Sequence, residues 1–226
     1  MPKHYVSNEN VSVRIFRSDL LEWFSHVHPA LPHVLYWPVV AATLWLSDTR
    51  GVALGRVALL FVGGALLWTV AEYIVHRFTF HPGPVIEGQV REIVAGLKPG
   101  EPALRAMRTL RQKQYFLAHG VHHDFPNDTL RLVMPPSVSI PLAVLFYALF
   151  TGIFGRAAGP ALFAGLVAGY IAYDTIHYAV HHFSLHGRVT LFLKKHHFRH
   201  HYQDSTRNFG VSSPLWDFVA GTYSPG

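Results

Sequence analysis

The sequence predicts an all-α, polytopic membrane protein with about four transmembrane helices, capped by a cytosolic, histidine-rich domain for two metal ions. Half of its 226 residues are apolar and only 14% are charged, whereas a typical soluble domain carries about 25% charged residues. Its 17 histidines outnumber the 13 acidic residues, and it has no cysteine, which excludes disulfides and thiolate metal sites. The length suits a single domain over residues 1–226, with a polar insert at 82–118.

Four apolar segments are candidates for membrane crossings, where a helix needs roughly 20 mainly apolar residues. They cover residues 30–46, 52–75, 138–154 and 158–180. The first is short and carries Pro32 and Pro38, so a tilted or re-entrant segment is the alternative there. Short connections at 47–51 and 155–156 predict that the first two segments and the last two form antiparallel hairpins.

Ten histidines fall into four groups at the ends of these segments or in the polar stretches beside them. The groups are His76 with His81; His119 with His122 and His123; His177 with His181; and His197 with His200 and His201. Spacings of three and four place side chains on one helix face, whereas His76 and His81 converge only if the helix breaks before Pro82. Because neutral imidazole is the commonest metal ligand, and so many clustered histidines would otherwise lack partners, we predict that all ten bind metal.

The number of ligands favours two ions. A structural zinc takes four ligands, whereas two six-coordinate ions have about twelve positions and would leave about two for O2, water or substrate. Imidazole suits iron, copper, zinc and nickel alike. We favour iron, because a site beside lipid suits the O2-dependent attack on C–H bonds, and zinc could replace it in a purified sample. The Glu-x-x-His repeats of soluble di-iron carboxylate bundles are absent.

The alternating direction of the four segments brings all four histidine groups to one membrane face. Sixteen of the 19 Lys and Arg residues lie on that side, so the positive-inside rule predicts that it is cytosolic. The first thirty residues are polar, and we expect no cleavable signal peptide. A multi-pass protein of the bacterial inner membrane and one of the endoplasmic reticulum both fit. A membrane surface suits the net charge of +6 better than nucleic acid does.

Three residues share a helical stripe with His177, namely Tyr170, Tyr173 and Asp174. An ionisable residue inside an apolar span is a functional candidate, so we expect Asp174, with Tyr173, to support catalysis by orienting a histidine. Tyr170 is a candidate for substrate contact. The alternatives are a structural acid and interfacial anchoring of the two tyrosines. His182, His186 and His196 are left over, and we expect supporting or surface roles for them.

Within the insert, Glu101 and Pro102 are typical of a helix start. The following residues alternate apolar Leu104, Met107 and Leu110 with basic Arg105, Arg108 and Arg111. This pattern fits an interfacial helix on anionic lipid, a docking face for an electron donor, or an ordinary solvated helix face.

The motifs resemble the fatty acid hydroxylase superfamily, and most of all its fatty acid 2-hydroxylase branch. The resemblance is carried by AEYIVHRFTFH at 71–81, HGVHHDFPNDTLRLVMPP at 119–136, YIAYDTIHYAVHH at 170–182 and LKKHHFRHHYQDSTRNFGVSSPLWDFVAGT at 193–222. It implies a small helical membrane fold and an O2-dependent hydroxylation of the carbon beside an acyl carboxyl or amide. It also implies the same ten ligands, with His197 rather than His196 in the last motif.

Three departures from the family pattern stand out. The 226 residues leave no room for the cytochrome b5 domain of many eukaryotic members, so electrons must come from a separate cytochrome b5-like or ferredoxin-like protein. The insert between His81 and His119 is longer than the resemblance leads us to expect. Asn127 stands where Met is usual.

The sequence therefore favours a di-iron lipid hydroxylase. The alternatives of the same class are a sterol or carotenoid oxidase or hydroxylase and a desaturase. A metal transporter or metal-binding protein is the alternative of another class, but transporters place ionisable residues near the middle of the membrane, and here the histidines lie at the ends of the segments. A catalytically inactive relative is disfavoured, because all ten ligands are present. The acyl length and the headgroup of the substrate stay open.

Overall fold

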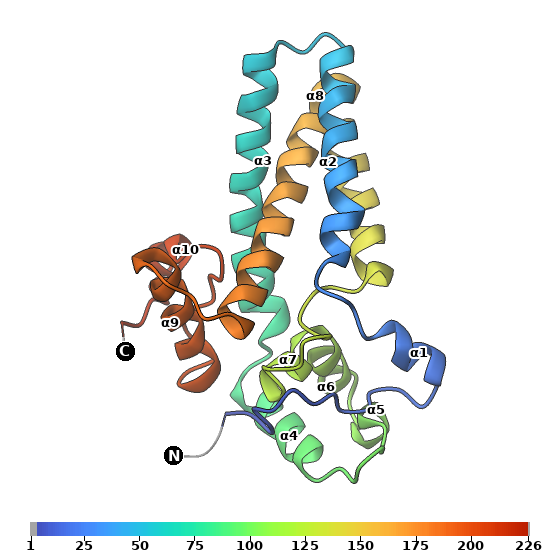
Figure 1. Cartoon of the computed structure of the whole chain (residues 1–226), viewed down its shortest axis with the longest axis vertical. Coiled ribbons are helices and arrows are strands. Elements are labelled where there is room, and N and C mark those ends of the chain that lie inside the picture. The colour runs from blue at the N-terminus through green and yellow to red at the C-terminus, as the bar shows by residue number, and fades with distance from the viewer. Residues whose placement is uncertain (1–3, 226) are drawn as a thin grey trace.

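The computed structural model describes residues 4–225, which form helices connected by loops, with no strand among them (Figure 1). The first helix, α1 (Asp19–Phe24), precedes three long ones, α2 (Leu31–Thr49), α3 (Leu54–Ile74) and α8 (Pro136–His182). The long helices stand side by side at one end of the molecule (Figure 1). The shorter helices gather around their other end, where the chain builds its second, smaller core (Figure 1).

Helix α8 consists of two limbs that fold back on each other at Gly155. Gly155 has φ +81° and ψ 162°, a conformation that favours glycine, and it interrupts the helical backbone. The rings of Tyr147 and Phe163, one from each limb, pack 5.4 Å apart. A Cβ at Gly159 would lie 2.6 Å from the carbonyl oxygen of Phe150, so the limbs touch backbone to backbone. The hairpin predicted at 155–156 is therefore present.

Glycines allow α3 and α8 to approach closely. A Cβ on Gly165 would lie 1.9 Å from the carbonyl oxygen of Phe61, and one on Gly64 would lie 2.0 Å from that of Leu162. Small residues at such crossings let helix backbones pack closely where the surroundings are apolar. This contact fixes how His76, in the segment that continues α3, sits relative to His177 near the end of α8.

Two helical segments are long and apolar enough to cross a membrane, Leu54–Phe80 and Pro136–His182. Large apolar side chains point outward from them, among them Leu59 at 72% exposure and Val144 at 64%, as expected for surfaces that face lipid. The second segment contains both limbs of α8, which correspond to the third and fourth predicted segments. Helix α2 matches the first predicted segment in position. That the chain crosses the membrane four times, and that the histidines lie on the cytosolic face, remain predictions.

The polar insert folds as α4 (Pro84–Ala95), α5 (Ala103–Ala106) and α6 (Leu110–Tyr115). The single amphipathic helix expected after Pro102 is wrong, because α5 ends after four residues. Met107 is extended, with φ −79° and ψ 130°, and its side chain is only 2% exposed in the core with Val90 and Val94. Thr109 then caps α6 in a capping box with Gln112.

Two π-helices and three further helices complete the fold. They are η1 (Val75–Phe80), η2 (Phe116–Gly120), α7 (Val121–Asp124), α9 (Arg188–Tyr202) and α10 (Leu215–Val219). The N-terminal segment is tied to this part of the chain, since the amides of Val6 and Ser7 both donate to the carbonyl oxygen of Asp124.

Candidate metal centre

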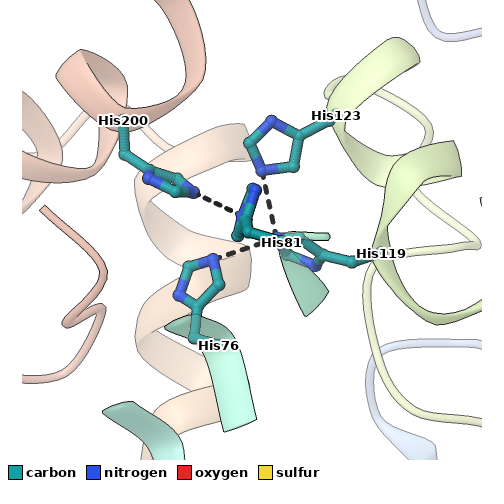
Figure 2. A group of neighbouring side chains, drawn as sticks. All are labelled: His76, His81, His119, His123 and His200. Atoms are coloured by element: carbon teal, nitrogen blue, oxygen red, sulfur yellow. Dashed lines mark hydrogen bonds between the residues drawn. The ribbon is translucent and has the colours of Figure 1, made fainter. Parts of the chain in front are cut away.

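All ten predicted histidines converge, and they do so as two groups of five. The first group comprises His76, His81, His119, His123 and His200, and the second comprises His122, His177, His181, His197 and His201. Within each group, one ring nitrogen from every histidine lies within 4.8 Å of all the others. Figure 2 shows the first group, with rings from three separate parts of the chain pointing at a common centre.

The π-helix η1 explains how His76 and His81 meet. A π-helix bonds residue i to residue i+5, so side chains five apart lie nearly above one another. The two rings are 5.1 Å apart between centroids. The helix ends at His81, whose backbone is extended, just before Pro82 as predicted. The wide turn itself was not visible in the sequence.

The two histidine groups are adjacent, and two of the four sequence motifs contribute histidines to both of them. His119 and His123, four apart, join the first group, whereas His122 joins the second. In α9 the assignment is reversed: His197 and His201 belong to the second group and His200 to the first. Residues i and i+4 lie almost in line on a helix while i+3 lies to one side, so each of these two three-histidine motifs serves both groups. The rings of His123 and His201 stack at 4.1 Å across the boundary.

Hydrogen bonds fix the tautomers of three histidines in the first group. His76 Nδ1 donates to the carbonyl oxygen of Phe209, and His200 Nδ1 donates to that of Arg207 at 2.7 Å. His81 Nδ1 lies 3.1 Å from Glu87 Oε1. Burial alone would raise the pKa of Glu87, but hydrogen bonds from His81 and Ser205 hold it below its ordinary value. The carboxylate accepts, so His81 Nδ1 carries the proton.

These tautomers leave bare nitrogens facing each other. His81 Nε2 and His200 Nε2 are 3.0 Å apart, and the Nδ1 of each ring is held by an acceptor, so in the neutral form of both rings the two Nε2 atoms are bare. Two lone pairs at that distance repel unless a cation lies among them. Neutral imidazole with its other nitrogen donating to a carboxylate or carbonyl is the usual form of a metal-bound histidine. The residues of the first group therefore fit a metal ion.

The second group has too few hydrogen-bond partners for its buried nitrogens. No partner is found, within residues 4–225, for His122 Nε2, His181 Nδ1, His197 Nδ1 or either nitrogen of His177 and His201. Buried polar atoms in folded proteins almost always have a partner. Burial lowers the pKa of His122 to about 3, and it lowers that of His201 well below the ordinary value. These rings are neutral at physiological pH, which is the form that binds metal.

Two acidic residues that sequence reasoning did not single out brace the loop at 207–213, which supplies the acceptor carbonyls. Glu72, buried at the end of α3, accepts hydrogen bonds from the amides of Val211 and Ser212. A charge near the end of an apolar span was the available signal for it. Asp217 on α10 accepts from the amides of Phe209 and Gly210 at 2.9 and 2.8 Å.

The left-over histidines take supporting or surface positions. His196 is fully buried, and its Nε2 lies 3.1 Å from Asp217 Oδ2. Burial alone would raise the pKa of Asp217, but the hydrogen bonds with His196, Thr222 and two backbone amides hold it below its ordinary value. His182 is partly exposed with its ring 4.4 Å from that of Tyr178, and His186 is exposed.

Tyr170, Tyr173 and Asp174, the three residues that share a helical stripe with His177, lie on α8. Tyr173 packs its ring 5.5 Å from that of His177. Tyr170 packs against Trp68 at 5.3 Å and lines an apolar cavity that also borders Tyr36 and Ser139. Asp174 is buried, and its Oδ2 has no partner within the described part of the chain. The orienting partners found for first-group histidines are thus Glu87 and two carbonyls, and the role of Asp174 stays a prediction.

Comparisons with known proteins agree with the motifs. The sequence model of the family described as "Fatty acid hydroxylase" matches residues 61–222. The dihydroceramide fatty acyl 2-hydroxylase FAH1 of Arabidopsis thaliana is 34% identical over 210 residues, covering 92% of this chain and 79% of that protein. The fatty acid 2-hydroxylase of Homo sapiens is 32% identical over 233 residues, covering 94% of this chain and 57% of that protein.

A solved structure is also similar. It is described as full-length scs7p with only the hydroxylase domain visible, and it matches with a TM-score of 0.75 at 32% identity. The match covers 91% of this chain and 70% of that one.

Proposed function

The chain belongs to the fatty acid hydroxylase family and is an oxidoreductase, and from this premise we propose that it hydroxylates a lipid acyl chain at carbon 2. The reaction would use two iron ions, O2 and electrons from a separate protein. The observation that carries the proposal is the convergence of ten buried imidazoles in two adjacent groups of five. Family membership sets aside the alternative of a metal transporter.

Each group would hold one ion. Five imidazole nitrogens leave one position of a six-coordinate ion open, which suits a catalytic site rather than a closed structural one. Iron bound in both groups would supply the activation of O2 for insertion of one oxygen atom into a C–H bond. Zinc would fit the same ligands in a purified sample.

The protein's own residues would orient the ligands and exclude water. Glu87 and the carbonyl oxygens of Arg207 and Phe209 hold three Nε2 atoms inward in the first group. Such partners raise ligand basicity and fix ring orientation. Asp174 and Tyr173 would support the reaction from α8, close to His177.

The acyl chain would reach this centre from the bilayer. The apolar cavity beside Tyr170 lies about two helical turns, roughly 10 Å, along α8 from His177. Its lining of Phe, Leu, Val and Trp side chains suits a hydrocarbon chain. We propose four crossings, by α2, α3 and the two limbs of α8, with the histidines on the cytosolic face.

The relatives suggest two candidate substrates. One relative is named for a dihydroceramide acyl group and another for a fatty acid, and both names specify position 2. The yeast relative from Saccharomyces cerevisiae, 34% identical over 208 residues, is named a ceramide very long chain fatty acid hydroxylase. An acyl group of a ceramide-type lipid or a free fatty acid is therefore the proposed substrate class.

The test is product analysis with isotopic oxygen. Cells that express the chain are grown under 18O2, and their lipids are compared with those of cells that express the His122→Ala, His123→Ala double variant. We expect 2-hydroxy acyl species that carry one 18O atom only with the unaltered chain. Labelled sterols or carotenoids instead, or no labelled lipid from iron-loaded protein supplied with a reductant, would reject the proposal.

A further inference from the structure

The insert carries several exposed basic side chains. Arg105, Arg108 and Arg111 are exposed, and none of them forms an ion pair within residues 4–225. We call these three residues the arginine patch. Lys98 and Lys113 lie nearby in sequence, and the neighbouring acid, Glu101, accepts a hydrogen bond from the amide of Lys98.

The patch is poorly suited to insertion into lipid. An interfacial helix needs a continuous apolar face. Here α5 stops after four residues, Met107 is buried, and Leu104 packs against the core of the insert. Leu110, at 71% exposure, is the apolar residue left among the arginines. A single exposed apolar side chain between arginines in the sequence instead resembles a protein-binding surface, where arginine is enriched.

The position of the insert also favours contact with a protein over insertion into lipid. Helices α4 and α5, of which α5 carries Arg105, lie at the end of the molecule opposite the free ends of the long helices (Figure 1). If the long helices cross the bilayer, α4 and α5 point away from it.

The patch is connected to the first histidine group. Arg111 Nη2 donates to the carbonyl oxygen of Pro82 at 3.1 Å, and Pro82 directly follows His81. The same insert supplies Glu87, which holds His81. Arg111 is thus linked to the proposed metal ligand His81 through one intervening residue, Pro82.

We propose that the arginine patch is the docking site of an acidic electron-carrier protein, of the haem or iron–sulfur class, that delivers electrons on the side of the first group. This rests on the proposed function. Inserting one atom of O2 into a C–H bond and releasing the other as water takes two electrons and two protons. Two reduced carriers, each oxidised by one electron, supply the electrons in turn. Complementary charge accelerates such encounters and makes them sensitive to salt.

The experiment compares two double charge reversals. Arg105→Glu with Arg108→Glu alters the patch, and Arg17→Glu with Arg188→Glu is the matched control, since both control residues are exposed and outside the patch. Each pair lowers the net charge from +6 by the same amount. The probes are the soluble haem domain of a cytochrome b5 and a plant-type ferredoxin. Their binding to the zinc-loaded chain and their rate of electron delivery to the iron-loaded chain are measured at several ionic strengths.

At low salt, at least one of the two probes should bind the patch variant at least about tenfold more weakly than the unaltered chain, and should reduce it at least about tenfold more slowly. Both differences should shrink as the salt concentration rises. The control pair should stay within about threefold of the unaltered chain. Carbodiimide cross-linking should join carboxylates of that probe to Lys98 or Lys113. Reduction by a small uncharged reductant should be equal in all three proteins.

Equal effects of the two pairs, cross-links confined to other lysines, or no binding of either probe to the unaltered chain would each overturn the proposal. Contact of the arginines with anionic lipid instead would leave carrier binding unchanged in the patch variant. Because binding is measured on zinc-loaded protein, failure of hydroxylation with docking intact would reject the proposed reaction alone.

Discussion

His81 and His200 face each other through their Nε2 atoms. Their Nε2 atoms are 3.0 Å apart, while His81 Nδ1 is held by Glu87 and His200 Nδ1 by the carbonyl oxygen of Arg207. Two histidines 119 residues apart are thereby held with their Nε2 atoms toward each other, the orientation that a shared metal ion requires. The relation makes Glu87, a residue of the insert, part of the support of the site.

Removing Glu87 should weaken one metal site. In Glu87→Ala, His81 Nδ1 loses its acceptor and the ring its orientation, so affinity for metal in the first group should fall about 10- to 100-fold. Chelator competition followed by metal analysis should show the content falling from two ions toward one. Glu92→Ala, an exposed acid on the same helix, is the control. Equal metal retention in both variants would contradict a supporting role for Glu87.

Neighbouring histidines should control different ions. His122 and His123 adjoin in sequence but belong to different groups, so His122→Ala should weaken the second site and His123→Ala the first. Each variant should retain close to one ion, and anomalous scattering should locate it in opposite groups. Loss of the same ion in both variants would show that the division into two groups of five is wrong.

The sequence predicted the ten histidines because the relevant information is local. Spacings of three and four within η2 with α7, within α8 and within α9, together with the direction of the apolar segments, predicted four groups on one side. The division between two groups depends on the rotation of each helix about its axis, which no spacing specifies. Likewise, nothing near Glu87 in sequence indicates that it will meet His81 across a turn at Pro82.

The insert shows where sequence patterning failed. The alternation of Leu104, Met107 and Leu110 with arginines fitted one amphipathic helix. Burial of Met107 in the core of Val90 and Val94 instead required an extended backbone at that residue. Tertiary packing overrode local propensity, as it often does in short segments. The arginines were correctly identified as exposed, but the apolar face was not.

Asp217 should be needed for stability as well as for the site. Its buried carboxylate accepts from His196, Thr222 and two backbone amides, so Asp217→Asn leaves at least one donor unsatisfied. We expect a loss of about 1–3 kcal/mol in the free energy of unfolding, with weaker metal binding because Phe209 is displaced. Thermal unfolding in detergent measures it, with exposed Asp48→Asn as control. An unchanged melting temperature would mean that the loop at 207–213 holds itself in place.

The close crossing of α3 and α8 should be required for both metal sites, because His76 lies in η1, which continues α3, and His177 lies in the last two turns of α8. In Gly165→Ala, the added Cβ would overlap the carbonyl oxygen of Phe61 at 1.9 Å, so the helices must separate. Overpacking of this kind costs about 1–3 kcal/mol. Gly152→Ala is a matched control on the same helix, since nothing lies within 4 Å of its added Cβ and alanine favours a helix more than glycine does. The melting temperature and the metal content should both fall for Gly165→Ala. For Gly152→Ala both should stay the same or rise. If the two variants behave alike, backbone proximity of these helices does not position the histidines.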